Sequence, residues 1–254
     1  MQKLKIKNRK NRNLVVVVEK SNPQKNLAFV MHGLSGHKDQ DHIKLFADTF
    51  KENNFTIIRF DTTNTFGESD GNYEDATLTN YYEDLEDVIN WTKNQELYQE
   101  PFVLCGHSLG GICIGLFAEK YPQKVKALVL VSTVVSGKLN VGRYTKEYLD
   151  EWQKTGFKET LGYFGNLKRL KFGFIEDGIK YDLIKDVDKL RMPVLLIVGD
   201  QDFSTPVEHH ELLFEKLHGK KEIHIIKDAP HTFRDKDHLD QIKIILNNWI
   251  KEIG

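Results

Sequence analysis

The feature that most constrains this chain is a short apolar run that ends in the pattern Gly-x-Ser-x-Gly at residues 106–110. The run at 102–105 predicts a buried strand, and helical periodicity follows directly after Ser108. A strand, a sharp reversal at a serine and an immediate helix together form a nucleophile elbow. Gly106 and Gly110 have no side chain, so strand and helix can approach closely. We therefore expect the Ser108 hydroxyl to stand exposed above the edge of a sheet.

The same pattern occurs a second time at residues 67–71, centred on Ser69. Polar, turn-rich residues surround this copy, with no strand in front of it and no helix close behind. Glu68 and Asp70 would also oppose negative charge developing on the serine or its substrate. The context therefore predicts Ser108 as the nucleophile and Ser69 as a loop residue.

Short β-rich runs alternate with amphipathic segments along most of the chain. This alternation is typical of an α/β domain whose mostly parallel sheet is covered by helices on both faces. Strands are predicted at 3–7, 14–19, 27–31, 55–60, 102–105, 127–131, 194–198 and 223–226. Helices are predicted at 39–53, 78–92, from Ser108 to about 120, at 206–217 and at 236–253. The first two strands read as a hairpin whose lysines protect a sheet edge.

The alternation breaks at residues 133–192, a segment rich in glycine and aromatic residues. A structureless loop of this length is improbable in a compact domain. We expect residues 133–192 to form a cap inserted after the sixth strand of an eight-stranded sheet, with residues 1–132 and 193–254 as the core. The spacing of Tyr144, Tyr148, Leu149 and Trp152 predicts a helix in this cap. Most cap aromatics are expected to pack its own small core.

Charge and cysteine content argue against several classes of protein. The formal net charge of -1 over 254 residues disfavours a nucleic-acid partner. Cys105 and Cys113 suggest neither a disulfide framework nor a metal site. No apolar run is long enough for a signal peptide or a membrane span, so the predicted location is cytoplasmic. A homodimer through the cap is compatible with the sequence but not required by it.

A serine hydroxyl needs a base, and the base needs a third group to orient it. Of the ten histidines, His231 follows the last predicted strand and precedes the last helix, at the sheet edge where the elbow opens. His107 precedes the serine, and its side chain should point away. For the acid, Asp202 and Asp200 both follow the strand at 194–198. We favour Asp202, because Asp200 is closer to the strand end and is expected to brace the turn.

Acyl transfer also requires donors for the developing oxyanion. The N–H of Leu109, directly after the serine, supplies one at a helix N-terminus. The second is expected from the loop after the strand at 27–31, where Gly33 lets the backbone turn inward and Leu34 offers its N–H. Taken alone, His32-Gly33 could be an ordinary turn at the end of a strand. Together with the elbow, the pair indicates an oxyanion-binding loop.

These residues together resemble the α/β-hydrolase superfamily over nearly the whole chain. Three motifs are similar to the bacterial esterase branch that includes cinnamoyl/feruloyl esterases and monoacylglycerol-lipase-like enzymes: His32-Gly33-Leu34-Ser35-Gly36, Arg59-Phe60-Asp61 leading to Gly67-Glu68-Ser69-Asp70-Gly71, and Gly106-His107-Ser108-Leu109-Gly110-Gly111. The loop between Asp61 and Ser69 departs from that pattern, being a residue longer and having Asn64 where glycine is common. The resemblance implies hydrolysis of a small-molecule carboxylic ester without metal or organic cofactor.

Two kinds of alternative stay open. A thioesterase, a small peptidase or a carbon–carbon bond hydrolase would use the same three side chains on a different bond. A non-catalytic ligand-binding protein could share the fold, although such a protein has little use for Ser108, Asp202 and His231 together. Dehalogenase and epoxide hydrolase chemistry is disfavoured, because those enzymes have a carboxylate where Ser108 stands.

Overall fold

A computed structural model describes residues 1–23, 26–162, 165 and 167–253, and eight strands within these residues form one sheet. The sheet order is β1-β2-β4-β3-β5-β6-β9-β10. Only β2 runs antiparallel to its neighbours, and the other pairings are parallel. The strands are β1 Gln2–Lys7, β2 Asn13–Glu19, β3 Asn26–Met31, β4 Phe55–Phe60, β5 Phe102–His107, β6 Val125–Val131, β9 Val194–Gln201 and β10 Lys221–Pro230. The predicted fold class is confirmed.

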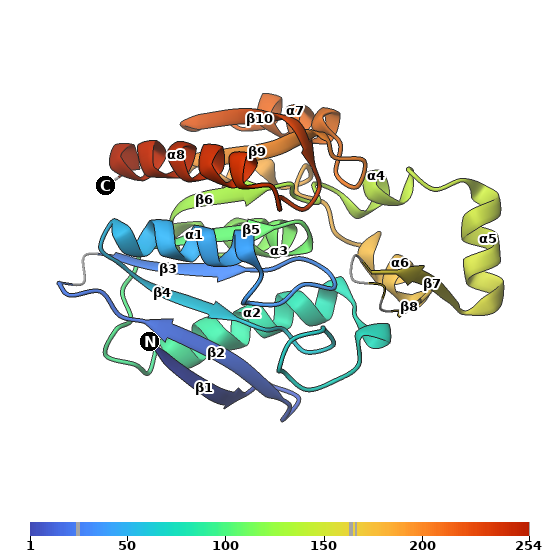
Figure 1. Ribbon diagram of the computed structural model, residues 1–254, viewed down its shortest axis with the longest axis horizontal. Helices are drawn as coiled ribbons and strands as arrows, with labels where there is room; N and C mark the ends of the chain where they lie inside the picture. The colour runs from blue at the N-terminus through green and yellow to red at the C-terminus, as the bar shows by residue number, and fades with distance from the viewer. Residues whose placement is uncertain (24–25, 163–164, 166, 254) are drawn as a thin grey trace.

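Five helices cover the two faces of this sheet (Figure 1). Successive side chains of a strand point to opposite faces. Leu27 and Phe29 of β3 accordingly enter the apolar core beneath α2, α3 and α7, whereas Ala28 and Val30 enter the core beneath α1 and α8. These helices are α1 Asp41–Glu52, α2 Leu78–Thr92, α3 Leu109–Lys120, α7 Val207–Lys216 and α8 Lys236–Ile253. Because both faces are covered, the central strands are apolar on both sides rather than alternating.

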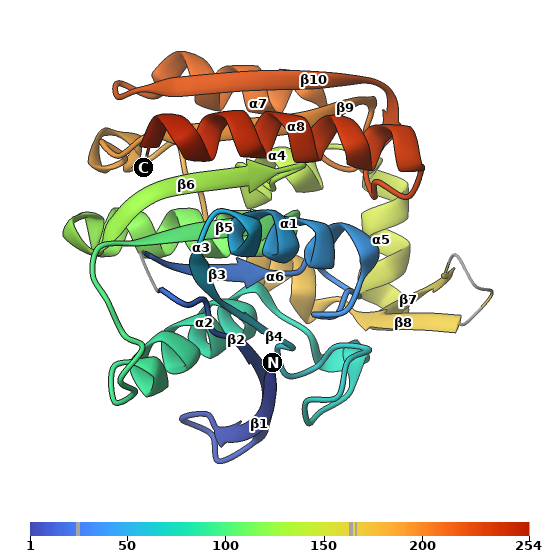
Figure 2. The same cartoon turned by 60° about the vertical axis from the view of Figure 1, so that its left-hand side comes forward.

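The described part of residues 133–192 begins beyond the carboxyl ends of the parallel strands and then returns along α3 to the amino end of β9 (Figures 1 and 2). They form α4 Gly137–Val141, α5 Lys146–Thr155, α6 Gly173–Gly178, a 3-10 turn at Val187–Lys189 and an antiparallel pair, β7 Phe157–Leu161 and β8 Leu167–Lys171. The helix predicted from the spacing of aromatic residues is α5. It begins after Tyr144, because the Thr145 side chain caps it by accepting a hydrogen bond from the Tyr148 N–H. The sequence did not predict the β7–β8 pair. Tyr163 and Phe164 lie outside the described residues.

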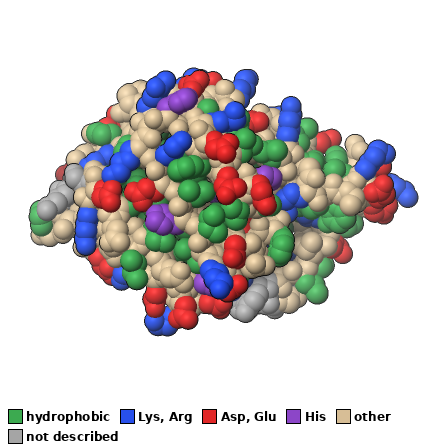
Figure 3. All heavy atoms as spheres, turned by 90° about the horizontal axis from the view of Figure 1, so that it is seen from above, with side chains coloured by type: hydrophobic (Ala, Val, Ile, Leu, Met, Phe, Trp, Pro, Cys, Tyr) green, Lys and Arg blue, Asp and Glu red, His purple; other side chains and the backbone are tan. Residues whose placement is uncertain are grey.

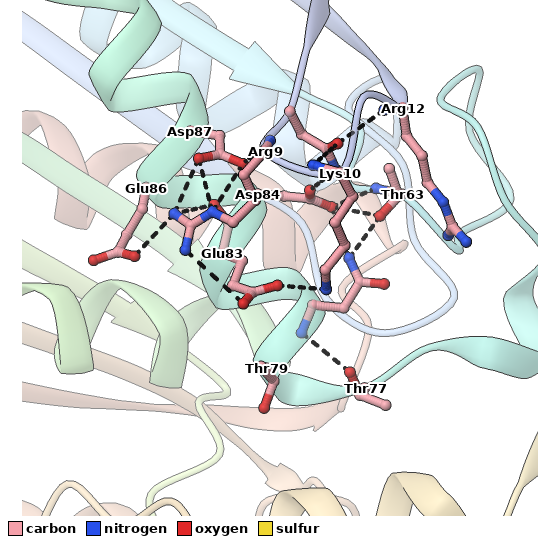
Figure 4. Close-up of polar contacts among 12 residues, drawn as sticks. Arg9, Lys10, Arg12, Thr63, Thr77, Thr79, Glu83, Asp84, Glu86 and Asp87 are labelled. Carbon is pink, nitrogen blue, oxygen red and sulfur yellow. Dashed lines mark hydrogen bonds and ion pairs between the residues drawn. The ribbon is translucent and has the colours of Figure 1, made fainter.

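Two basic residues of the first hairpin, Arg9 and Lys10, are paired with acids on α2 (Figure 4). Arg9 forms ion pairs with Glu86 at 3.0 Å and with Asp87 at 2.9 Å, and Lys10 reaches Glu83 at 2.5 Å. These two charges of the turn between β1 and β2 are therefore neutralised within the molecule. On the face that Figure 3 shows, positive and negative side chains are likewise interspersed. Within the described ranges, no helix is long and apolar enough to cross a membrane.

Candidate active site

The turn from β5 into α3 holds Ser108 in an unusual backbone conformation. Its φ of 55° and ψ of -117° lie in a region that residues with a side chain rarely adopt. Hydrogen bonds on both sides hold it there: its N–H donates to the Val131 carbonyl at 3.0 Å, and its carbonyl accepts from the Val134 N–H at 3.1 Å. A Cβ at Gly106 would lie 2.6 Å from the Gly110 carbonyl oxygen. The geometry matches the elbow expected from the sequence.

Three side chains from separate loops meet at the carboxyl edge of the sheet. The Ser108 Oγ lies 2.9 Å from the His231 Nε2. The His231 Nδ1 lies 2.8 Å from one carboxylate oxygen of Asp202 and 3.0 Å from the other. The structure thus brings together the serine, the imidazole and the carboxylate that the sequence singled out. The ring of His231 is partly exposed, whereas the carboxylate of Asp202 is fully buried.

The buried carboxylate of Asp202 is surrounded by donors. One oxygen accepts from the N–H groups of Ser204 and Thr205, both at 2.9 Å, and the other accepts from the Thr205 hydroxyl at 2.8 Å. Burial disfavours the charged form, but the hydrogen bonds from His231 and Thr205 outweigh it and hold the pKa of Asp202 well below its usual value. The carboxylate is therefore charged and oriented toward the imidazole at neutral pH.

His107 supports the backbone of His231 rather than contacting the serine hydroxyl. Its Nε2 lies 2.9 Å from the His231 carbonyl oxygen, so it carries the proton and donates it. Burial lowers the pKa of His107 to about 3, which keeps the ring neutral. His42 packs edge-on against His107, with ring centroids 4.5 Å apart. The sequence predicted that His107 would point away from the serine; it did not predict this contact.

The loop after β3 places the Leu34 N–H beside the elbow. The Gly33 carbonyl accepts from the His32 Nδ1 at 2.8 Å and from the Gly36 N–H at 3.0 Å. Because a trans peptide directs its C=O and N–H in opposite directions, these bonds turn the Leu34 N–H the other way. A Cβ at Gly33 would lie 2.7 Å from the Ser108 Cβ, so only glycine fits here.

Leu109 contributes the second N–H expected from the sequence. It is the first residue of α3, where N–H groups have no partner within the helix. Within the described ranges, neither Leu34 nor Leu109 donates its N–H to a backbone acceptor outside regular elements. Both residues line the same cavity as Ser108 and His231. Two N–H groups at the serine are thus available to a ligand oxygen.

This cavity, of about 190 Å³, opens between the elbow and residues 133–192. Its lining from the latter segment is Val134, Asn140, Arg143, Tyr144, Lys158 and Phe174. A smaller, mostly apolar pocket adjoins it and adds Leu78, Val141 and Ile175. Three larger surface hollows, beside Asn53, Tyr73 and Trp91, have no described serine, histidine or cysteine in their lining. The chemistry-bearing residues therefore converge on the cavity at Ser108.

The alternative residues that the sequence offered, Ser69 and Asp200, lie outside the cavity. Ser69 is buried, donates to the Asp61 carbonyl at 2.7 Å and accepts from the Val15 N–H at 2.8 Å, so it braces a loop. Asp200 is exposed and remains within β9, which corrects the expectation that it braces the turn. The strand continues through Gln201 because that residue pairs with Pro230 of β10. Asn64, in place of a glycine, has a φ of 57°, which asparagine tolerates better than most residues.

Sequence reasoning missed several residues around the site. Thr205 could have been found, because a threonine three residues after an aspartate often closes a turn onto its carboxylate. Arg143 and Lys158 carry no local signal, since only the folding of residues 133–192 brings them to the cavity. Among the described residues, no group of three or more His, Cys, Asp or Glu could hold a metal ion.

Comparison with known proteins identifies a family and several relatives. A family model described as "Serine aminopeptidase, S33" matches residues 22–164, more than half of the chain. The bovine palmitoyl-protein thioesterase ABHD10, mitochondrial, is 24% identical over 78% of this chain and 64% of its own length.

Two solved structures share the fold. Est1E from Butyrivibrio proteoclasticus with bound ferulic acid has a TM-score of 0.83 at 22% identity, covering 98% of both chains. Mouse alpha/beta hydrolase domain-containing protein 10 has a TM-score of 0.82 at 19% identity, covering 100% of both chains.

Proposed function

We propose that this chain, which belongs to the serine aminopeptidase S33 family of α/β-hydrolases, cleaves carboxylic esters through an acyl-enzyme at Ser108. The observation that carries the proposal is the unbroken contact from the Ser108 Oγ to the His231 Nε2 and from the His231 Nδ1 to Asp202. The residues follow one another in the chain as serine, aspartate and histidine, the order typical of this superfamily. We also propose that residues 133–192 act as a cap over this site.

In the first half of the reaction, the Ser108 Oγ attacks the ester carbonyl carbon while His231 accepts its proton. The carbonyl π bond becomes a negative charge on oxygen, and the N–H groups of Leu34 and Leu109 stabilise it. Asp202 stabilises the imidazolium that forms, because it is charged, buried and held by Thr205. Collapse of the intermediate breaks the ester C–O bond, and His231 protonates the leaving alcohol.

In the second half, water replaces the alcohol. His231 accepts a proton from water as the water oxygen attacks the acyl carbon, and the same two N–H groups hold the second oxyanion. Collapse returns the proton to the Ser108 Oγ and releases the acid. In both half-reactions the catalytic groups are side chains and N–H groups of this chain. Removing one oxyanion donor typically costs about 10²–10³ in rate.

Thioester hydrolysis is the second candidate, since a thioesterase is among the relatives. The same mechanism would serve a thioester with a thiol as the leaving group. The family description also names an aminopeptidase, so aminoacyl amides belong in the comparison. Values of kcat/KM for matched aryl esters, acyl thioesters and aminoacyl amides would rank the three bonds. A preference for the oxygen ester supports the proposal, and a preference for either other bond replaces it.

The nucleophile is tested by Ser108→Ala, with Ser69→Ala as the matched control from the second Gly-x-Ser-x-Gly pattern. We expect Ser108→Ala to lower turnover of an aryl ester by several orders of magnitude, about 10⁶-fold in a comparable serine hydrolase. Ser69→Ala should keep its turnover, because Ser69 braces a loop away from the cavity. A fluorophosphonate probe should label every variant except Ser108→Ala. Near-normal turnover by Ser108→Ala would remove it from the mechanism.

A further inference from the structure

Two positive side chains line the cavity beside Ser108, and neither has a negative partner among the described residues. Arg143 and Lys158 are the only Lys or Arg residues in the described lining, and no Asp or Glu lines it. The chain as a whole has 37 acidic and 36 basic residues, so the lack of acids here does not follow from composition. This imbalance is local to the wall that faces the serine.

The two cations are held by one aromatic side chain. The Tyr144 hydroxyl oxygen accepts from Lys158 at 3.2 Å and from Arg143 at 3.4 Å. The Lys158 Nζ lies 4.9 Å from the centre of the Tyr144 ring, and the Arg143 guanidinium carbon lies 5.1 Å from it. Because both cations bind one phenol, two like charges stand close together, which is unfavourable without a counter-charge.

The remaining contacts orient the two cations without neutralising them. Lys158 lies 4.2 Å from the centre of the buried Trp152 ring. Arg143 donates to the carbonyl of Phe203 at 2.8 Å and to the carbonyl of Asn140 at 3.0 Å. All of these partners are neutral, so the positive charge of both groups remains available to a ligand. Preoriented cations of this kind bind carboxylate and phosphate oxygens strongly.

A third cation lies beside the loop that carries Leu34. Lys168 of β8 donates to the Ser35 hydroxyl at 2.9 Å, next in the chain to Leu34 of the cavity. Burial, followed by the positive charge of Arg234, lowers the pKa of Lys168. The surroundings of the cavity on this side are thus positive as well.

We propose that the site takes esters that carry an anionic group, a carboxylate or a phosphate, which binds Arg143 and Lys158 while the rest of the substrate reaches Ser108. The adjoining apolar pocket shares Tyr144 and Phe174 with the cavity and would hold an apolar part of the same molecule. This inference rests on the proposed ester hydrolysis and names its substrate class.

The test compares similar esters with and without an anionic group. On the acyl side, mono-4-nitrophenyl glutarate is paired with 4-nitrophenyl pentanoate, with spontaneous hydrolysis subtracted. On the alcohol side, the pentanoate esters of 4-hydroxybenzoate and of 4-hydroxyphenyl phosphate are paired with that of methyl 4-hydroxybenzoate. In at least one pair we expect the anionic ester to have a kcat/KM about tenfold to a hundredfold higher, the effect of one charged hydrogen bond. The preferred pair identifies the side of the ester and the kind of anion.

Variants connect the preference to the two cations. In Arg143→Gln/Lys158→Met the ratio of anionic to neutral kcat/KM should fall to about 1, and Lys158→Arg should retain most of it. Lys154→Met removes a charge from the exposed surface of α5 and should leave the ratio unchanged. A wild-type enzyme that hydrolyses neutral esters without favouring any anionic one would overturn this inference alone, as would a preference that survives the double variant. A wild-type enzyme inactive on all of these esters would overturn the proposed function.

Discussion

At the scale of single residues, the site depends on several histidines that the fold keeps neutral. His32, His42, His107 and His210 are buried, and burial lowers the pKa of each. His32 directs the Gly33 carbonyl, and His107 binds the His231 carbonyl. His231, by contrast, is partly exposed and contacts both Ser108 and Asp202. On the proposed mechanism, this ring is the one that gains and loses a proton.

This difference predicts the dependence of activity on pH. A histidine base cannot accept a proton once it is itself protonated, so activity should fall on acidification. Asp202 remains charged at mildly acidic pH, because its pKa is lowered, and the buried His107 and His210 remain neutral. We expect kcat/KM for a neutral ester to fall as pH falls from 8 to 5, with the profile of a single ionisation. Enzyme returned from pH 5 to pH 8 should regain full activity, and a flat profile would contradict the role of His231.

The N–H of Leu34 can be tested through Gly33. A methyl group at Gly33 would lie 2.7 Å from the Ser108 Cβ and 3.1 Å from the His107 Nδ1, so the loop must shift. We expect Gly33→Ala to lower kcat/KM by about 10²–10³, comparable to losing one oxyanion donor. Gly173→Ala is the control, because nothing lies within 4 Å of a methyl group there. Equal activity of the two variants would argue against the assigned loop.

At the scale of elements, the sequence predicted the strands and the core helices well, because their periodicity is local. That Ser108, Asp202 and His231 would meet at one edge of the sheet could be predicted for the same reason, since each follows a recognisable strand. The β7–β8 pair was not predicted, because residues 157–161 carry little apolar pattern and are mostly exposed. The contact of Lys158 of β7 with Tyr144, which precedes α5, joins separate parts of residues 133–192. Such contacts depend on tertiary packing, which no short window of sequence contains.

Helix α3, which begins at the elbow, also carries a buried carboxyl group near its end. The Glu119 Oε1 is buried and has no hydrogen-bond partner in the described structure. Burial, followed by the nearby charge of Asp186, raises the pKa of Glu119 to about 8. The folded state therefore keeps a proton that the unfolded state loses above its ordinary pKa of 4.5. Stability from this group is complete below pH 4.5 and is lost as pH rises toward 8.

The substitution Glu119→Gln removes this ionisation while keeping the shape of the side chain. We expect the variant to have a free energy of unfolding about 1–3 kcal/mol higher than wild type at pH 8. The difference should vanish near pH 4, where both side chains are neutral in both states. Urea denaturation at several pH values measures both quantities. A difference that does not change with pH would show that Glu119 is not protonated in the folded state.

At the scale of the whole molecule, a buried histidine joins the core to the segment beyond it. The His210 Nε2 of α7 accepts from the Thr133 N–H at 2.8 Å, and its Nδ1 donates to the Pro206 carbonyl at 3.1 Å. Protonation at Nε2 would destroy the first of these bonds. Burial lowers the pKa of His210 to about 4, so between pH 6.5 and 4 the unfolded state binds a proton that the folded state does not. Stability consequently falls as pH falls through this window.

We therefore expect the free energy of unfolding to decline on acidification, with His210 contributing about 1.4 kcal/mol per pH unit within the window. His210→Gln retains an acceptor for the Thr133 N–H but does not titrate. Between pH 6 and 4.5, the free energy of unfolding of His210→Gln should therefore change less steeply with pH than that of the wild type. The difference in slope should be about 1.4 kcal/mol per pH unit, the effect of one proton. Chemical denaturation of both proteins at half-unit steps measures the two slopes, and identical slopes would refute the assignment.

The strand order has a further consequence for how the protein is made. The reactive alcohol follows β5 in the middle of the sheet, whereas the imidazole follows β10, an edge strand that docks beside β9. A chain growing from the ribosome therefore exposes its alcohol long before a base reaches it. On the proposed mechanism, Ser108 of the nascent polypeptide does not react until β10 has docked beside β9. The time at which a serine-directed probe begins to label the chain would therefore report completion of the sheet.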